Sequence, residues 1–223
     1  MTLNDLATDG VLRCAINTGN RALVQVGAEG ELGGVSPALA RRLAEEIGAT
    51  FQPVIYDGAG KVFADAGGAV WDVGFLAVDP ARATAVSFTR PYHGIEATFA
   101  VRRGSGIDTV EGWDTPGRVI VTSVGSAYEL FLSANAMQAA LQVGGTPGES
   151  FEAFRAGAGD MVAGVRQSLE KAFAGDDAIT VLPGHLTKVE QAMVLPHPDD
   201  PRIALLDEFV ARAMADGFVA REL

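Results

Sequence analysis

Residues 72–92 read DVGFLAVDPARATAVSFTRPY, and this stretch decides the fold. Residues 73–78 form an apolar run typical of a buried strand. Asp79-Pro80 follows, an N-cap residue with proline at the first helical position, and predicts a short helical turn carrying Arg82. Residues 86–89 predict a second extended piece. Ligands bind beyond the carboxyl ends of strands in open α/β sheets, so Arg82 lies where its guanidinium can bind a carboxylate or phosphate. A solvated helix arginine is the alternative.

Two motifs in this stretch, DPAR at 79–82 and SFTRPY at 87–92, carry a resemblance to a known family. They are similar to the segment T-x-E-R … D-F-S-x-P-Y of the family-3 extracellular solute-binding proteins, the polar amino-acid receptors of bacterial ABC importers. The resemblance covers nearly the whole chain. It implies an α/β, two-lobed fold of the type II periplasmic-binding-protein kind, in which each lobe is a mostly parallel sheet flanked by helices and two strands form the hinge. It also implies that Arg82 binds the α-carboxylate of the ligand.

Composition narrows the classes of partner. The chain has 223 residues, enough for one large domain or two small lobes, and a net charge of -11. A chain with this negative charge is not expected to bind nucleic acid or anionic membrane surfaces. Its single cysteine, Cys14, excludes an internal disulfide, and its three scattered histidines do not have metal-ligand spacing. We therefore expect no metal and no cofactor, and we expect a monomer.

The N-terminal residues bear on localisation. No stretch approaches the roughly 20 apolar residues of a membrane span, so direct membrane insertion is not expected. MTLNDLATDGVLRCA has no basic segment, apolar segment or cleavage site of an export signal. We expect a periplasmic or extracellular protein if a signal peptide was trimmed, and a cytoplasmic one if this N-terminus is native. The resemblance implies a small carboxylate ligand and the membrane subunits of an ABC importer as partners.

The order of elements predicts two α/β units. Strands are expected at 10–17, 51–56, 97–102, 119–124, 160–164, 179–182 and 191–195. Helices are expected from Ser36-Pro37 to Gly48, at 59–66, at 126–142, at 150–157, at 168–173 and at 203–215. The last helix is expected to bury Leu206, Phe209, Val210 and Met214. The lobes are predicted as residues 1–98 plus 194–223, and residues 99–193.

The second lobe offers its own anion-binding device. Ser126 and Glu129 have the spacing of a capping box, and they begin a helix at Gly125-Ser126-Ala127. Such a helix start directs free N–H groups and a positive dipole end toward an anion. A carboxylate bound by both this helix start and Arg82 would close the hinge.

The remaining candidate site residues follow from the resemblance. The family usually has a stacking aromatic in the loop after the first strand, and the corresponding position here is Asn20. A second aromatic corresponds to Tyr56, for which packing in the core is the alternative. Phe75 and Ala77 replace small hydroxyl residues, although their backbone groups can still bind a ligand.

The largest departure concerns the ligand's ammonium group. Amino-acid receptors place an acidic residue shortly after the strand that begins near Asp160, and this chain has Val165 there, followed by Arg166. Asp160 itself is expected to be structural. Because a desolvated ammonium without a counter-charge is costly, an ordinary amino acid is a poor ligand for this site. Arg166 favours a second anionic group if it faces the site; otherwise it points to solvent.

Three functions remain open from the sequence. The first is a binding protein that delivers a small carboxylate to an importer or a sensor. The second is an enzyme on the same fold, similar to the dehydratases of this superfamily, for which Glu96, Asp57 and Glu129 are the acids to inspect. The third is a subunit that has lost ligand binding and acts through protein contacts.

Overall fold

The computed structural model describes all residues, 1–223, and divides into two compact units. Unit 1 comprises Met1–Thr18, Leu23–Gly94 and Glu190–Leu223, and unit 2 comprises Gly19–Ala22 and Ile95–Val189. The main crossings therefore fall at 94/95 and 189/190, four residues before the boundaries expected at 98/99 and 193/194. The short loop Gly19–Ala22 groups with unit 2 although its neighbours in the chain belong to unit 1.

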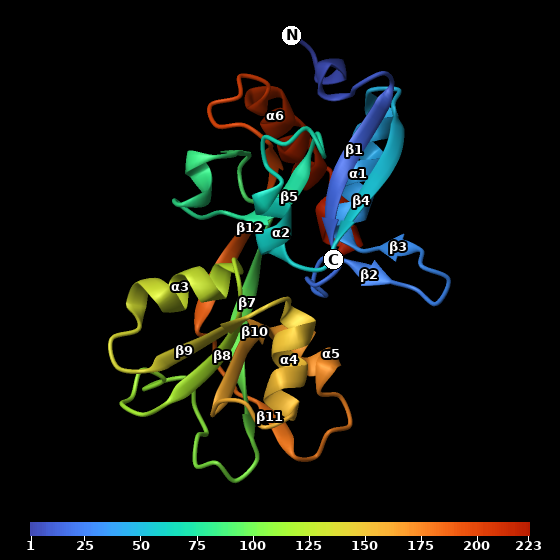
Figure 1. Cartoon of the computed structure of the whole chain (residues 1–223). Coiled ribbons are helices and arrows are strands. Elements are labelled where there is room, and N and C mark those ends of the chain that lie inside the picture. The colour runs from blue at the N-terminus through green and yellow to red at the C-terminus, as the bar shows by residue number, and fades with distance from the viewer. The chain divides into compact units, whose positions relative to one another are not determined.

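Unit 1 is built on a parallel core of strands with helices packed beside it (Figure 1). Its strands are β1 (Val11–Asn17), β2 (Gln25–Val26), β3 (Leu32–Gly33), β4 (Thr50–Tyr56), β5 (Gly74–Ala77), β6 (Ser87–Phe88) and the end of β12 (Thr187–Leu195). Its helices are η1 (Leu3–Leu6), α1 (Val35–Glu46), α2 (Ala59–Ala64), η2 (Arg82–Thr84), α6 (Ile203–Ala215) and α7 (Phe218–Glu222). β1 pairs in parallel with β4, and β5 pairs antiparallel with β12.

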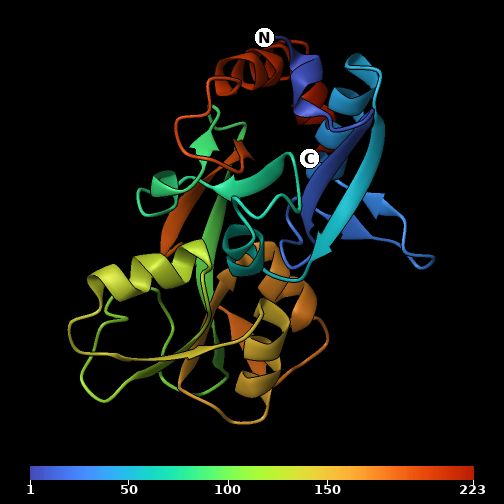
Figure 2. The ribbon, with the colours of Figure 1, turned by 45° about the horizontal axis from the view of Figure 1, so that its top comes forward.

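Unit 2 is a second α/β layer structure. Its strands are β7 (His93–Arg102), which enters the unit at Ile95, β8 (Val119–Ser123), β9 (Ala140–Gly144), β10 (Met161–Val165) and β11 (Ile179–Val181). β8 pairs in parallel with both β9 and β10, whereas β10 and β11 pair antiparallel with β7. The helices are α3 (Ala127–Asn135), α4 (Pro147–Arg155) and α5 (Arg166–Ala172). Figures 1 and 2 show α4 and α5 together on one side of these strands and α3 on the other.

Each unit has its own apolar core. In unit 1, Trp71, Leu76 and Val194 pack with the ring of Tyr56, and Trp71 donates its indole N–H to the carbonyl oxygen of Val62. In unit 2, aromatic side chains of α4 pack against the inner face of β8 and β10, and the cluster consists of Ala100, Val121, Phe151, Phe154, Val162, Leu169, Phe173 and Ile179. These cores hold the strand ends at which the candidate residues lie.

The expected α/β class is confirmed, but several helix limits were wrong. The helix expected at Ser36-Pro37 begins at Val35, with Gly34 as its N-cap, because the Ser36 hydroxyl bonds Tyr92 at 3.2 Å. The helix expected at 150–157 begins at Pro147, because Thr146 and Glu149 form its capping box.

The helix expected to run to residue 142 ends at Asn135. The backbone N–H groups of Met137, Gln138 and Ala139 donate to the carboxylate of Asp114 at 3.0, 2.9 and 2.7 Å, so this segment turns back and enters β9. A capping carboxylate 23 residues upstream cannot be recognised from the local pattern.

In α6 the expected burial of Met214 was wrong. Met214 is 41% exposed, and Ala213 takes the place on the core face. Leu206, Phe209 and Val210 are buried as expected. With Ala213 they follow the i, i+3, i+4, i+7 pattern of one helix face, which Met214 does not share.

Candidate functional site

Arg82 is a buried cation at the carboxyl end of β5. Its side chain belongs to a residue only 1% exposed, which excludes the solvated helix arginine. The Asp79 carboxylate accepts from the backbone N–H groups of Ala81 at 2.8 Å and Arg82 at 3.3 Å, but the turn η2 begins at Arg82 with Ala81 as its N-cap, two residues later than expected. The guanidinium Nη1 then donates to the carbonyl oxygen of Ala77 at 3.0 Å. The guanidinium is thus held in a fixed orientation, and its planar set of N–H donors suits a carboxylate.

Aromatic side chains lie close to the end of β5. Phe75 and Tyr92 are buried and meet edge to face, with ring centroids 6.3 Å apart. Burial raises the pKa of Tyr92, whose hydroxyl is hydrogen-bonded to Ser36, so the phenol is neutral at ordinary pH. Ala77 is buried, and its carbonyl oxygen is the one that accepts from Arg82. Phe75 and Ala77 thus belong to the strand whose end holds the guanidinium, and their contact with a ligand stays a prediction.

Tyr56 ends β4 with its ring in the core of unit 1. Its hydroxyl donates to the Asp65 carboxylate at 2.7 Å. Burial, and then the bond to Asp65, raise the pKa of Tyr56. The structure gives this ring the contacts of the core-packing alternative, and its stacking on a ligand stays a prediction.

The start of α3 is a capped helix N-terminus in unit 2. Ser126 is buried, and its hydroxyl oxygen accepts from the backbone N–H of Glu129 at 3.1 Å. The Glu129 carboxylate accepts from the N–H of Gly125 at 3.2 Å, one residue before the position that a capping box would use. Gly125 has a φ of 65°, a left-handed conformation that glycine adopts readily. Gly125, Ser126 and Ala127 therefore stand at the positive end of a nine-residue helix, directly after β8.

Asn20 lies on the loop that follows β1 and belongs to unit 2. Ser168, on α5, accepts from the N–H of Arg21 at 3.1 Å and donates to the carbonyl oxygen of Gly19 at 3.2 Å. Sequence reasoning missed Ser168, because it is 147 residues from the loop that it fixes. Two hydrogen bonds from one buried hydroxyl hold Asn20 in a defined place.

Arg166 is engaged with protein groups of unit 2. Its Nε lies 3.3 Å from the Glu96 carboxylate, and its Nη1 donates to the carbonyl oxygen of Leu182 at 3.2 Å. Its Nη2 donates to the carbonyl oxygen of Gly184, and Glu170 lies 3.9 Å from Nη1. Arg166 thus joins α5 to β7 and to the segment that follows β11, and an anionic ligand would compete with Glu96 for it.

No acidic residue stands where the resemblance places the counter-charge for a ligand's ammonium group. Val165 is the last residue of β10 and precedes the first residue of α5. Asp160 is structural as expected, because its carboxylate accepts from the backbone N–H of Val119 at 2.7 Å. The Glu96 carboxylate lies close to three basic side chains: Arg166 at 3.3 Å, His185 at 3.8 Å and Lys188 at 3.9 Å.

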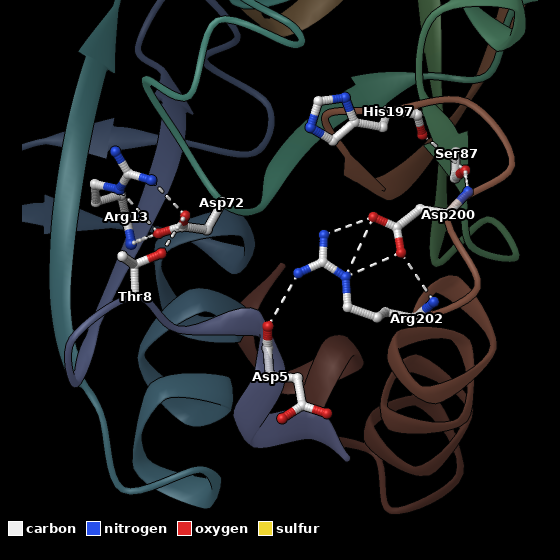
Figure 3. A network of polar contacts seen from close by, with 8 residues as sticks. All are labelled: Asp5, Thr8, Arg13, Asp72, Ser87, His197, Asp200 and Arg202. Atoms are coloured by element: carbon white, nitrogen blue, oxygen red, sulfur yellow. Dashed lines mark hydrogen bonds and ion pairs between the residues drawn. The ribbon is translucent and has the colours of Figure 1, made fainter. Parts of the chain in front are cut away.

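Figure 3 shows the polar network of unit 1 that includes a serine, a histidine and an aspartate. The Ser87 hydroxyl donates to the backbone carbonyl of His197 at 2.9 Å and accepts from the N–H of Asp200 at 2.8 Å. The Asp200 carboxylate is paired with Arg202 at 2.6 Å. Because neither the imidazole nor the carboxylate contacts the Ser87 hydroxyl, these residues fasten a loop and do not form a nucleophile–base pair.

Two broader features of the molecule bear on function. No group of three or more histidine, cysteine, aspartate or glutamate side chains is arranged to hold a metal ion. None of the helices combines the length and apolar character needed to cross a membrane.

Comparison with known proteins gives one family and a consistent fold. The family model described as "Bacterial extracellular solute-binding proteins, family 3" matches residues 12–221. No curated protein matches the chain.

Among solved structures, the solute receptor for L-cysteine of Neisseria gonorrhoeae has a TM-score of 0.86 at 18% identity and covers 100% of this chain and 92% of its own. A mutant of ArgBP from T. maritima has a TM-score of 0.82 at 15% identity, with 99% and 96% covered. An ancestral amino-acid-binding protein, described as a precursor of cyclohexadienyl dehydratase, has a TM-score of 0.80 at 18% identity, with 98% and 96% covered. At these identities the likeness establishes the fold, and the expected type II periplasmic-binding-protein fold is confirmed.

Proposed function

The chain belongs to the bacterial extracellular solute-binding proteins of family 3, and we propose that it binds a small molecule bearing a carboxylate, either an organic acid or an amino-acid-like compound. The observation that carries this proposal is the buried guanidinium of Arg82 at the carboxyl end of β5. A guanidinium donates two parallel hydrogen bonds to a carboxylate, and such a pair is worth about 2–3 kcal/mol when water is excluded.

The helix start at Gly125-Ser126 is proposed as the second group that binds this carboxylate. Its support is the position of Ser126 after β8 and at the N-terminus of α3.

The charges of unit 2 support a ligand without an ammonium group. Val165 supplies no counter-charge, and Glu96 is already paired with Arg166, His185 and Lys188. An ammonium would lose its water without gaining a free carboxylate, which is unfavourable. An organic acid is therefore the preferred ligand within the proposed class, although the Neisseria gonorrhoeae relative is named as a receptor for L-cysteine.

The partner and the compartment are proposed from the family. The family description places its members outside the cell, and one structural relative is named as a putative binding component of an ABC transporter from Wolinella succinogenes. We therefore propose delivery of the acid to an ABC importer or a sensor in the periplasm.

The dehydratase alternative finds little support in the acids that we considered. Asp57 pairs with Lys61 at 2.9 Å, and Glu96 lies beside the cations Arg166 and Lys188. Glu129 accepts hydrogen bonds from Gly125 and Ser133. Each of these carboxylates is thus engaged with protein groups, whereas a general acid must be able to reach the proton acceptor on its substrate.

A thermal-shift screen of the purified chain tests the proposal. The panel contains amino acids, dicarboxylates, keto acids and aromatic acids. A ligand at about 100 times its dissociation constant adds about 2.7 kcal/mol of stability, which is readily measured. We expect a shift from acids that lack an amino group, and we expect Arg82→Ala to abolish it.

Arg90→Ala is the matched control, because Arg90 is in the same stretch, 72–92, but is exposed and paired with Asp207 at 2.7 Å. It should retain the ligand-induced shift. A shift confined to ordinary amino acids would still support a carboxylate ligand, but it would show that the ligand is an amino acid and not an organic acid without an amino group. The absence of a shift from every acid would contradict the proposal.

A further inference from the structure

Asn20 carries a buried amide oxygen without a hydrogen-bond partner. Three buried side-chain oxygens have no hydrogen-bond partner in the structure, and they belong to Asn20, Thr122 and Ser150. Thr122 lies within β8 and Ser150 within α4, where packing surrounds them. Asn20 is the one on a loop. Buried polar groups in proteins are nearly always satisfied, so an unpaired acceptor calls for a partner that this structure does not contain.

The place of this oxygen suits a ligand. The loop follows the carboxyl end of β1, and it is bonded to Ser168 on the helix that follows the carboxyl end of β10. In open α/β sheets the ends of strands are where ligands bind. The two hydrogen bonds of the Ser168 hydroxyl fix the backbone on both sides of Asn20, which lowers the cost of ordering this loop when a ligand binds.

The charges of unit 2 indicate which group of a ligand can donate a hydrogen bond to the Asn20 oxygen. An amide oxygen is neutral. On α5, the helix that carries Ser168, Arg166 pairs with the carboxylates of Glu96 and Glu170. Val165, which precedes this helix, carries no charge. A neutral hydroxyl is satisfied by one amide oxygen, whereas an ammonium would leave most of its charge uncompensated.

We propose that Asn20 is a specificity-determining residue whose amide oxygen accepts a hydrogen bond from a hydroxyl group of the ligand, so that the preferred ligands are hydroxy acids. The inference rests on the proposed function, in which Arg82 binds the carboxylate of the same molecule. It deepens that function by naming the substrate class. Asn20 thereby distinguishes a hydroxyl from an ammonium and from a hydrogen at one position of the ligand.

Calorimetric titration with matched acids tests this assignment. The triplets are lactate, alanine and propionate; malate, aspartate and succinate; and 2-hydroxyglutarate, glutamate and glutarate. In at least one triplet, the hydroxy acid should bind about tenfold or more tightly than the other two members, as expected for one buried hydrogen bond. Asn20→Leu should remove that preference and leave the affinity for the deoxy acid within about twofold.

Asn20→Asp provides a second variant with a readout that a structural role would not give. It adds a carboxylate, so the amino acid of the same triplet should gain affinity while the hydroxy acid loses it. Ligand-free thermal unfolding of both variants serves as the folding control, and Asn20→Leu should not lower the midpoint, because the oxygen it removes has no partner in the protein.

Two results would overturn the inference while leaving the proposed function intact. One is an amino acid that binds most tightly in every triplet. The other is an Asn20→Leu variant that weakens all three members equally. In either case, loss of binding in Arg82→Ala would still support the carboxylate site, whereas failure of all nine compounds to bind would count against both proposals.

Discussion

In unit 1 the buried Asp200 forms an ion pair with the partly exposed Arg202, and the effect of this pair on stability depends on pH. The Arg202 guanidinium donates from Nε at 2.9 Å and from Nη2 at 2.6 Å, and these bonds are the main cause that lowers the pKa of Asp200 (Figure 3). The folded pKa therefore lies below the unfolded value of about 3.9. The pair contributes its full stability above that value and loses it as the pH falls through the folded pKa.

We expect Asp200→Asn to lower the free energy of unfolding by about 2 kcal/mol at pH 7. The difference from the wild type should shrink as the pH falls below about 4, because the wild-type carboxyl is then protonated as well. Urea denaturation at several pH values measures this. Asp199→Asn is the control, since Asp199 is exposed, and it should change little. A difference for Asp200→Asn that does not vary with pH would contradict the assignment.

At the scale of elements, the start of α1 depends on one glycine. Gly34 is the N-cap of this helix with a φ of 89°, and a Cβ atom there would lie 2.6 Å from the backbone oxygen of Leu23. Backbone atoms cannot move aside as a flexible side chain can. Gly30, in the preceding turn, has a φ of 85°, but a Cβ atom there would meet nothing within 4 Å.

The two glycines thus separate backbone strain from steric overlap. Gly30→Ala should cost about 1 kcal/mol for the left-handed conformation alone. Gly34→Ala should cost about 3 kcal/mol or more, because α1 or the segment at Leu23 must shift. Chemical denaturation of the two variants gives the comparison. Equal destabilisation would show that overlap with the Leu23 oxygen does not limit this position.

At the scale of the whole molecule, local patterns predicted most of the fold. Apolar runs located β1, β4, β5, β8 and β10, and the Ser126–Glu129 spacing located the start of α3. Helix limits were less accurate where a distant group sets them, as Asp114 does for the end of α3. A turn at Arg82 could also be predicted, because it is built from adjacent residues, whereas the binding of a ligand by Arg82 stays a prediction.

The parts of the candidate site that the sequence could not predict depend on long-range contacts. From the sequence, Arg166 was expected either to face a ligand or to point to solvent. Its bond to Glu96, 70 residues away in the chain, could not be predicted from local residues. The bond between Ser168 and the loop of Asn20 likewise leaves no local pattern. Burial is a property of the folded chain, and the unpaired oxygen of Asn20 becomes visible only there.

The central claim is that Arg82 binds the carboxylate of the ligand. Calorimetric titration of the wild-type protein with the best acid from the screen, and with the carboxamide of the same acid, tests it most directly. The carboxamide keeps the shape and removes the charge, so we expect it to bind at least about 100-fold more weakly than the acid. Arg82→Ala should reduce the difference between the two compounds to a few-fold. Equal affinities of the acid and the carboxamide for the wild-type protein would show that Arg82 does not bind a carboxylate.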